Sequence, residues 1–544
     1  MTGRERLAWV LLGLAALAVY LPGLDRPLRD AEAKYAQVPR EMLETGDWLT
    51  PRLDGARYYV KPPLGYWPTA ALFAVAGPSE AAARLTNVAS ALVAAFLIGL
   101  LARRLFGPTP GLLSGALFLL TTEVYVYCLD AGLEFWLIAC QVLAFLFLWR
   151  GSLFGFHAAL GLGFLVKGLP GVLIPLAAAA LADPRRAMRL LHPRGLAGLA
   201  LVVGPWLAWM TLQHPDFFDV FVVNEHLHRF TGRMASNDAL FPTGLWLVLV
   251  AAEFFPWILH LPGAGRELAR MVRANAVARE KAVFLGAWAA VPLVLYALSR
   301  SKVDFYGLEI YPPLLIGVAV PLADLLGERR FASGRRWALP WLGVSGVAAT
   351  CLVVLMLARN ADWFLALEIP SLPAAAVFLS SASVLGLGAG LAFLRERPRL
   401  ALGAVALLCA VLFGVQRVTF EAGFEHSSMK FAADLLEGRL REDDLLITDE
   451  RSEFEHVASL VWYSGRPVQM LRDRESSIMH FIEPDRNALC MDEPELVAEV
   501  CGGRTTYLVA ETEPTPARLA ELGLDGQSLG SASDRSLFAL ACAP

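Results

Sequence analysis

The chain has 544 residues, of which 56% are hydrophobic and 18% are charged, and its mean hydropathy is +0.50. An average soluble protein carries about 25% charged residues, so this composition indicates a polytopic membrane protein. The formal net charge of -4 excludes a broad basic surface, and we expect no nucleic-acid partner.

Apolar segments long enough to cross about 30 Å of hydrocarbon as helices predict roughly thirteen transmembrane spans. The first, over 7–22, has no small-residue cleavage site after it, so we expect it to be retained as a span. The others cover 82–102, 108–127, 131–149, 154–166, 168–182, 196–212, 243–260, 282–299, 306–324, 337–357, 373–394 and 400–416.

Lys and Arg gather in alternate connections between these segments, and the positive-inside rule makes those connections cytoplasmic. They contain Arg4/Arg6, Arg103/Arg104, Arg150, Arg185/Arg186/Arg189/Arg194, Arg266/Arg270/Arg273/Arg279/Lys281, Arg329/Arg330/Arg335/Arg336 and Arg395/Arg397/Arg399. The outward-facing parts are then 23–81, 128–130, 213–242, 300–305, 358–372 and everything after about 417. Each polar cluster described below falls on that outer side.

The last part of the chain changes character. Short β-like runs at 445–448, 467–471, 506–509 and 537–540 alternate with helical stretches near 453–463, 494–500 and 515–522. This alternation predicts a membrane domain over 1–416 and a small α/β domain over 417–544. Outside the cytoplasm a Cys490–Cys501 disulfide is chemically permitted.

The first outer loop carries carboxylates at the start of a helix-forming run. Asp30 and Glu32 precede AKYAQV, and Gly46 is a predicted helix stop. Asp30 is as consistent with a helix cap as with a catalytic group. Its position beside the membrane, close to Glu32, favours function because polar groups held there are often functional.

The second half of this loop is rich in turn residues, and Pro62-Pro63 stiffens the backbone next to Lys61. Lys61 is therefore a candidate for holding an anion at a fixed place. Electrostatic contact of Lys61 and Arg57 with lipid headgroups is the alternative. Tyr35, Arg57 and Tyr59 are further candidate substrate contacts.

Two more ionisable residues lie at predicted helix junctions. Asp130 follows the third apolar segment, and Lys167 separates the short fifth and sixth segments. Asp130 is either a catalytic carboxylate or the cap of the next helix. Lys167 either contacts an anionic group or extends its ammonium toward the interface.

The 213–242 loop contains a polar run with Glu225, His226, His228 and Arg229. Arg229 is a candidate phosphate clamp, because a guanidinium binds phosphate in a bidentate manner. The two histidines suit a metal only on an extended segment, so no metal ligand is assigned and a divalent cation stays open as a cofactor.

Lys302 and Tyr306 form one more cationic and aromatic cluster, at the outer end of the tenth segment. Several cationic clusters on one side of a membrane protein favour a bound anion.

Several motifs together resemble the bacterial polyprenyl-phosphate-sugar-dependent glycosyltransferases. This family includes the lipid A aminoarabinose transferases and is related to the protein O-mannosyltransferases. The motifs are DAEAKYAQVPREMLETGDWLTPRLDGARYYVKPPLGYW, ARL at Arg84, YCLD at Asp130, VKGLP at Lys167, EHLHRF at 225–230 and SKVDFYGLEIYPP at 301–313.

The resemblance implies a GT-C architecture in the bacterial cytoplasmic membrane, with an active site on the periplasmic side. It implies a polyprenyl-phosphate-linked sugar as donor, with Lys61, Arg229 and Tyr306 around the carrier phosphate and Lys302 nearby. Asp30 falls in the acidic motif of the first loop, but Ala31 separates it from Glu32, so either carboxylate is a candidate for the reaction. Val60 stands where the aminoarabinose transferases tend to carry Glu.

These residues suit inverting single displacement. Cations at Lys61 and Arg229 stabilise the leaving phosphate, and Asp30, Glu32 or Asp130 serves the acceptor as general base or orienting group. The acceptor is a lipid, a glycan or a protein, and membrane lipids are further partners. The alternative function is a flippase for lipid-linked sugar or a secondary transporter, although transporters usually hold their ionisable residues near the membrane midplane.

Overall fold

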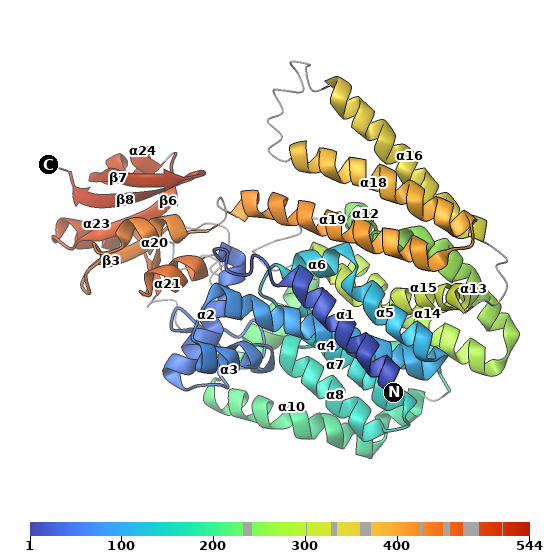
Figure 1. Ribbon diagram of the computed structural model, residues 1–544. Coiled ribbons are helices and arrows are strands. Elements are labelled where there is room, and N and C mark those ends of the chain that lie inside the picture. The colour runs from blue at the N-terminus through green and yellow to red at the C-terminus, as the bar shows by residue number, and fades with distance from the viewer. Residues whose placement is uncertain are drawn as a thin grey trace.

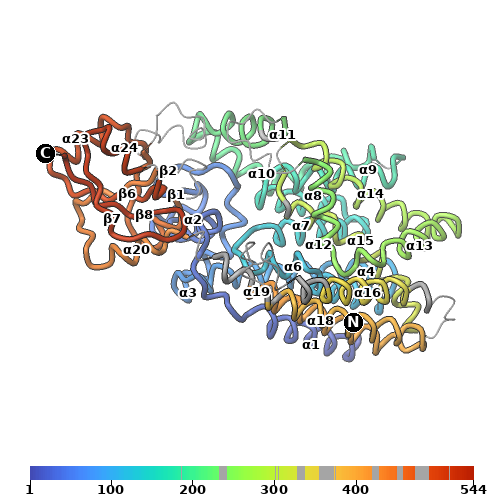
Figure 2. The backbone as a smooth tube through the Cα atoms, turned by 90° about the horizontal axis from the view of Figure 1, so that it is seen from above, coloured from blue at the N-terminus to red at the C-terminus, as the bar shows by residue number. Residues whose placement is uncertain are grey.

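The computed structural model describes residues 1–185, 187–231, 242–300, 302–327, 334–358, 372–424, 428–449, 457–471, 489–513 and 515–543. A bundle of helices makes up most of the molecule, and a small sheet that includes the C-terminal strands lies at one end of it (Figure 1). The N-terminus lies away from that sheet, and helix α1 runs from it along the bundle toward the sheet end (Figures 1 and 2).

The bundle is built from consecutive helices of very different lengths. These are α1 (Gly3–Tyr20), α2 (Asp30–Thr45), η1 (Pro63–Gly65), α3 (Trp67–Ala76), α4 (Glu80–Phe106), α5 (Pro108–Leu119), α6 (Thr122–Cys128), α7 (Glu134–Trp149), α8 (Leu153–Lys167), α9 (Pro170–Ala182), η2 (Ala187–Leu191), α10 (Pro193–Gln213), η3 (Asp219–His228), α11 (Arg229–Thr231), α12 (Thr243–Glu253), η4 (Trp257–His260), α13 (Leu261–Ala274), α14 (Ala276–Leu298), η5 (Asp304–Glu309), α15 (Tyr311–Leu326), α16 (Gly334–Ala358), α18 (Leu372–Leu394) and α19 (Pro398–Phe424). Every predicted apolar segment lies on one or two of them.

By length and composition, fewer of these helices are complete transmembrane spans than the roughly thirteen that the sequence predicts. Within the described residues, five helices are long and apolar enough to cross a membrane unaided, or seven if each of two bent pairs is one span. The bent pairs are α5 with α6, at 56°, and α12 with the segment Trp257–Ala274, at 92°. A further five apolar helices are shorter than 18 residues, α7, α8 and α9 among them.

The segment between α1 and α4 forms a folded cap rather than an open loop. Helix α2 begins at Asp30 and ends at Gly46, whose φ of +69° is the left-handed geometry typical of a helix stop, as predicted. The strands β1 (Arg52–Leu53) and β2 (Ala56–Arg57) then pair antiparallel across Asp54 and Gly55, both with positive φ. Positive φ at both central residues is the geometry of a type I′ hairpin turn.

The C-terminal part contains a mixed six-stranded sheet with the order β5-β4-β3-β6-β8-β7. Strands β3, β4, β5 and β6 pair parallel, and β7 and β8 add an antiparallel edge. The strands and helices are α20 (Lys430–Leu436), β3 (Leu445–Thr448), α21 (Ala458–Ser464), β4 (Gln469–Leu471), β5 (Cys490–Met491), α23 (Glu493–Cys501), β6 (Thr506–Glu511), α24 (Thr515–Glu521), β7 (Leu524–Ala532) and β8 (Arg535–Cys542). All four predicted strands are present, and β5 and β7 were missed.

The two faces of this sheet belong to different hydrophobic clusters. Leu445, Ile447 and Leu508 pack with α23 and α24 on one face. Leu446 and Val509 face the other way and share a cluster with apolar residues of α2 and the β1–β2 hairpin. The sheet is therefore packed directly on the cap between α1 and α4, and α19 continues past the predicted domain boundary at 416.

The cysteine pairing differs from the one considered from the sequence. Cys501 at the end of α23 is bonded to Cys542 at the end of β8, so Cys490 takes no part in this bridge. The Cys490–Cys501 bridge that the sequence permitted is not formed, because Cys490 lies within β5, where it is buried in the hydrophobic cluster beneath the sheet.

Candidate active site

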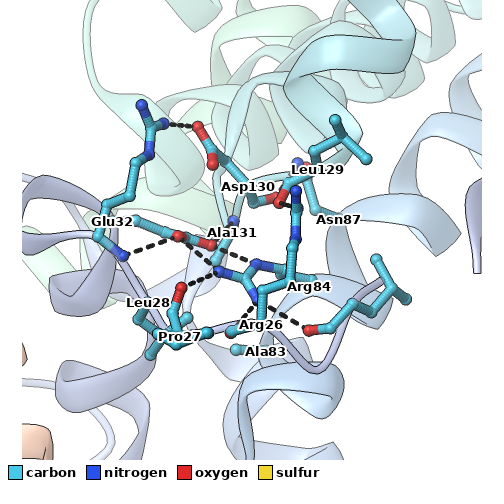
Figure 3. Close-up of polar contacts among 12 residues, drawn as sticks. Arg26, Pro27, Leu28, Glu32, Ala83, Arg84, Asn87, Leu129, Asp130 and Ala131 are labelled. Atoms are coloured by element: carbon cyan, nitrogen blue, oxygen red, sulfur yellow. Dashed lines mark hydrogen bonds and ion pairs between the residues drawn. The ribbon is translucent and has the colours of Figure 1, made fainter. Parts of the chain in front are cut away.

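A buried ion pair between Glu32 and Arg84 anchors the cap to the helix bundle (Figure 3). Arg84 Nε and Nη2 donate to the two carboxylate oxygens of Glu32 at 2.7 and 2.9 Å. The remaining donors of Arg84 reach the carbonyl oxygens of Leu24, Arg26 and Pro27. Since the Arg84 and Glu32 side chains are 0% and 1% exposed, this pair fixes where α2 starts rather than facing a ligand.

Asp130 lies on the junction between α6 and α7, directly beside this anchor (Figure 3). The next residue, Ala131, donates its backbone N–H to Glu32 at 2.8 Å, and Asn87 holds the Asp130 carbonyl oxygen. The Asp130 carboxylate forms an ion pair with Arg29 through Oδ2, while Oδ1 accepts no hydrogen bond within the described residues. Asp130 does not cap α7, whose N-cap residue is Leu133.

The structure holds Asp30 against the C-terminal sheet domain. Its carboxylate accepts hydrogen bonds from Ser459 of α21 and from the backbone N–H of Met429, and it forms an ion pair with Arg535 of β8. Asp30 is 5% exposed. Asp30 therefore helps to attach the C-terminal domain. Its partners differ from those of Glu32 and Asp130.

Lys61 forms a buried ion pair with Glu225. The ammonium lies 2.7 Å from Glu225 Oε1, and the two side chains are 15% and 3% exposed. Glu225 belongs to η3 (Asp219–His228), a π-helix, which is a rare conformation often found at functional sites. Two of the residues expected at the site are thus in direct contact.

Lys167, at the end of α8, forms a second ion pair with Glu134, the first residue of α7. Lys167 Nζ lies 2.5 Å from Glu134 Oε1, and the two side chains are 9% and 2% exposed. The Tyr127 hydroxyl donates to the other oxygen of Glu134. The Lys167 ammonium also lies over the rings of Phe305 and Tyr306, 5.2 and 5.5 Å from their centroids.

Close packing brings the two ion pairs into one site. A Cβ added to Gly65 would lie 3.0 Å from the Leu133 side chain and 3.2 Å from the Val166 carbonyl oxygen. Gly168 has a φ of +83°, and a Cβ there would lie 2.5 Å from His226 Nε2. Glycine is needed at both positions, because any side chain would push apart the segments that carry Lys61, Lys167 and Glu225.

Tyr66 lies between the two ion pairs. Its side chain is 1% exposed, and its hydroxyl has no hydrogen-bond partner within the described residues. Burial raises the pKa of Tyr66, and the nearby carboxylates of Glu225 and Glu134 raise it further. A buried hydroxyl without a partner is costly, so this group is suited to bind something that enters the site. The ring of Tyr35 stacks on Tyr66, with centroids 6.3 Å apart.

Tyr306 lies beside Lys167, and Lys302 precedes it by four residues on the same connection. The Tyr306 ring stacks on Tyr296, with centroids 4.3 Å apart, next to Lys167. Lys302 is 5% exposed and forms no ion pair with any residue in the described part of the chain. The backbone N–H of Arg300 donates to the Phe230 carbonyl oxygen, so the segment with Lys302 runs beside α11 (Arg229–Thr231).

The other expected residues lie in structural contacts or outside the described set. Arg57 is 3.9 Å from Asp216, and Tyr59 packs on Phe217 and the ring of His214. The Arg229 side chain lies outside the described residues.

The two histidines of the polar run give no sign of a metal site. Nδ1 of His226 is 2.6 Å from the Phe221 carbonyl oxygen, and its Nε2 accepts from the Leu169 N–H. His228 is half-buried on η3. No three His, Cys, Asp or Glu side chains among the described residues are grouped to hold a metal ion.

Three residues that build or support the site were not predicted from the sequence: Glu134 and Tyr66 in the site itself, and Arg84, which anchors the cap beside it. Glu134 follows Asp130 by four residues, and Tyr66 follows Lys61 by five. In the sequence both look like residues that merely begin a helix, so neither was singled out. Arg84 stands in an apolar segment, where a charged residue is expensive and therefore usually paired or functional. That rule was the available signal for Arg84.

Comparison with known proteins identifies relatives of this chain. Residues 60–209 match the family described as dolichyl-phosphate-mannose-protein mannosyltransferase. An undecaprenyl phosphate-α-4-amino-4-deoxy-L-arabinose arabinosyl transferase of Aeromonas salmonicida is 32% identical over 363 residues, which are 63% of this chain and 64% of that protein. The Pseudomonas aeruginosa enzyme of the same name is 33% identical, over 65% of this chain and 66% of its own length. The matched region thus spans just under two thirds of these relatives.

The fold has counterparts among solved structures. ArnT from Cupriavidus metallidurans bound to undecaprenyl phosphate superimposes with a TM-score of 0.81 and 24% identity, over 98% of both chains. The oligosaccharyltransferase AglB from Archaeoglobus fulgidus gives a TM-score of 0.51 with 10% identity, over 96% of this chain and 71% of that one. Both the helix bundle and the C-terminal sheet therefore lie within an ArnT-like fold.

Proposed function

We propose that this chain is a GT-C glycosyltransferase related to the aminoarabinose transferases and that it uses a polyprenyl (undecaprenyl) phosphate-linked sugar as donor. It moves the sugar to a lipid, glycan or protein acceptor at the outer face of the bacterial cytoplasmic membrane. The observation that carries the proposal is the position of Tyr66 near both the Lys61–Glu225 and the Lys167–Glu134 ion pairs, with a buried hydroxyl that has no hydrogen-bond partner among the described residues. Such a group of buried donors suits an oxyanion that develops charge.

The orientation of the proposed enzyme follows from where its charges lie. Lys281 donates to the Leu105 carbonyl oxygen and Arg104 to the Trp149 carbonyl oxygen, so several basic connections meet at one end of the bundle. The C-terminal domain, with its Cys501–Cys542 disulfide, lies at the other end (Figures 1 and 2). Basic loops are typical of the cytoplasmic side and disulfides of an oxidising compartment, which supports an orientation with the site outside.

In the proposed mechanism the cations serve the leaving group. The phosphate of the carrier takes up negative charge as its bond to the anomeric carbon breaks. Lys61 and Lys167 stabilise that charge, with Tyr66 donating its O–H and Tyr306 beside them. Lys302, a buried cation without an ion-pair partner in the described part of the chain, adds to the same anion-binding side.

Asp130 is the carboxylate that we assign to the acceptor. Glu32 is saturated by Arg84 and the Ala131 N–H, and Asp30 is held by Arg535, whereas one oxygen of Asp130 accepts no hydrogen bond from a described residue. With a hydroxyl acceptor, Asp130 removes its proton as the new glycosidic bond forms and the carrier phosphate leaves, which inverts the anomeric centre. With a phosphate acceptor, no proton needs to move and Asp130 orients the nucleophile.

The test compares variants of the three carboxylates in purified protein with a polyprenyl-phosphate sugar and an acceptor. We expect Asp130→Asn to lower turnover at least about a hundredfold with little change in the KM of the donor, because general base catalysis typically contributes 10²–10⁴-fold. Asp30→Asn should instead lower the thermal stability. Full turnover of Asp130→Asn would refute the assignment, and mass spectrometry of envelope glycans from a strain lacking this chain would identify the sugar and the acceptor.

A further inference from the structure

A cavity on the basic end of the bundle is unrelated to the site above. It lies at the bend where the segment Trp257–Ala274 turns by 92° from α12. Helix α13, which contacts α14 and α15, therefore runs across the direction of α12. Figures 1 and 2 both place α13 at the end of the molecule opposite to α2 and the C-terminal sheet.

One side of this cavity is cationic. The cavity has a volume of about 390 Å³ and is lined by Arg266 and Arg270 of α13, with Glu267 between them. Residues four apart on a helix share a face, so both guanidinium groups reach the same opening. Arg270 is paired with Glu267 at 2.8 Å, whereas Arg266 forms no ion pair within the described part of the chain. The charged residues of the lining therefore carry a net positive charge, with two arginines against one glutamate.

The opposite side is apolar and rigid. Trp337 and Leu339 of α16 line it, and the Trp337 ring lies against His260, with centroids 4.4 Å apart. His260 is fixed in turn by the indole N–H of Trp341, which donates to Nε2 at 3.2 Å. Leu339 is 65% exposed and continues the apolar wall toward the outside of the bundle.

An occupant must therefore combine an anionic head with a hydrocarbon part. A soluble anion would satisfy Arg266 and Arg270 but leave Trp337 and Leu339 in contact with water. We propose that this cavity binds one anionic phospholipid of the cytoplasmic leaflet, with the phosphate on Arg266 and Arg270 and the first part of an acyl chain along Trp337 and Leu339. Anionic lipids are concentrated in that leaflet, next to the Lys- and Arg-rich connections.

The experiment measures lipid binding to the full chain in detergent by native mass spectrometry, with phosphatidylglycerol and phosphatidylcholine as probes. We expect one phosphatidylglycerol to bind at least about tenfold more tightly than phosphatidylcholine, given the electrostatic contribution of two arginines at a membrane surface. The double variant Arg266→Gln/Arg270→Gln should lose this preference, and Arg266→Lys/Arg270→Lys should keep most of it. Arg273→Gln is the matched control, because Arg273 is exposed on the same helix but does not line the cavity.

Three results would overturn the proposal. They are equal affinity for the two lipids, unchanged phosphatidylglycerol binding in the double glutamine variant, and full displacement of the lipid by millimolar inorganic phosphate, which would make a free anion the ligand. Thermal unfolding in phosphatidylcholine separates a folding defect from a binding defect. If the glutamine variant is unstable there, the lysine variant and the Arg273→Gln control decide the question. Loss of the phosphatidylglycerol preference in both of these variants would contradict the assigned cavity.

Discussion

The ion pair between Glu32 and Arg84 gives the sharpest test of how the cap is held on the bundle. Arg84→Met leaves the Glu32 carboxylate buried with only backbone donors, and it removes the partners of the Leu24, Arg26 and Pro27 carbonyl groups. Breaking a buried pair by removing one partner typically costs about 3–5 kcal/mol. We expect a loss of that size in the free energy of unfolding, with the donor-binding activity lost at lower temperature than in the wild type.

The assay is unfolding in detergent, followed by intrinsic tryptophan fluorescence, for Arg84→Met, Glu32→Met and the double variant. The free energy of unfolding of the double variant should fall by about 1–3 kcal/mol less than the sum of the losses in the two single variants. The reason is that the double variant has no buried charge left without its partner, whereas each single variant has one. Arg103→Met, on the same helix, is the control, since its pair with Glu5 is 34% and 23% exposed. Additive losses, or an Arg84→Met variant as stable as Arg103→Met, would refute the reasoning.

Three further predictions concern the site and the C-terminal domain. Tyr66→Phe should raise the KM of the donor about tenfold, the worth of about one hydrogen bond, without lowering stability, and equal KM values would exclude the hydroxyl from the site. Burial, together with the nearby Glu41 carboxylate, raises the pKa of Asp54 from 3.8 to about 8. The protonated side chain therefore contributes fully to stability below about pH 4, and this contribution is lost as the pH rises through 8. The unfolding free energy of Asp54→Asn should therefore fall less steeply with pH over this window than that of the wild type, and an equal slope would contradict this pKa. The disulfide closes a loop of 41 residues, which is worth about 4 kcal/mol of stability. In Cys501→Ser the sheet domain should therefore unfold at a lower denaturant concentration, and an unchanged unfolding midpoint would contradict this.

The sequence was sufficient to locate the helices. Long hydrophobic runs are strong signals, and the helix stop at Gly46 and the turn at Asp54-Gly55 depend on local backbone geometry alone. Lys61 and Glu225 were both candidates because they belong to polar runs in outer loops, but their contact with each other was not predicted. Strand β7, with its glycines and polar residues, carries too little apolar alternation to be seen.

What the sequence could not show was which carboxylate meets which cation. Asp30 and Glu32 are two residues apart on one helix turn, yet Asp30 contacts Arg535 and Glu32 contacts Arg84. These contacts join residues more than 50 positions apart, so they depend on how the cap, the bundle and the sheet pack. The Cys501–Cys542 bridge was missed for the same reason, because the antiparallel strands β7 and β8 bring Cys542 back to the end of α23.

The most direct test of the central claim is the KM of the polyprenyl-phosphate sugar in the wild type and in Lys61→Met, with free polyprenyl phosphate as the measured product. A hydrogen bond to a charged group is worth about 1.5–3 kcal/mol, so we predict a KM roughly 10 to 150 times higher for Lys61→Met and an unchanged value for the exposed control Lys430→Met. Transfer of sugar with release of free polyprenyl phosphate supports the glycosyltransferase. Movement of the intact donor across the membrane without such release, or an unchanged KM in Lys61→Met, would contradict it.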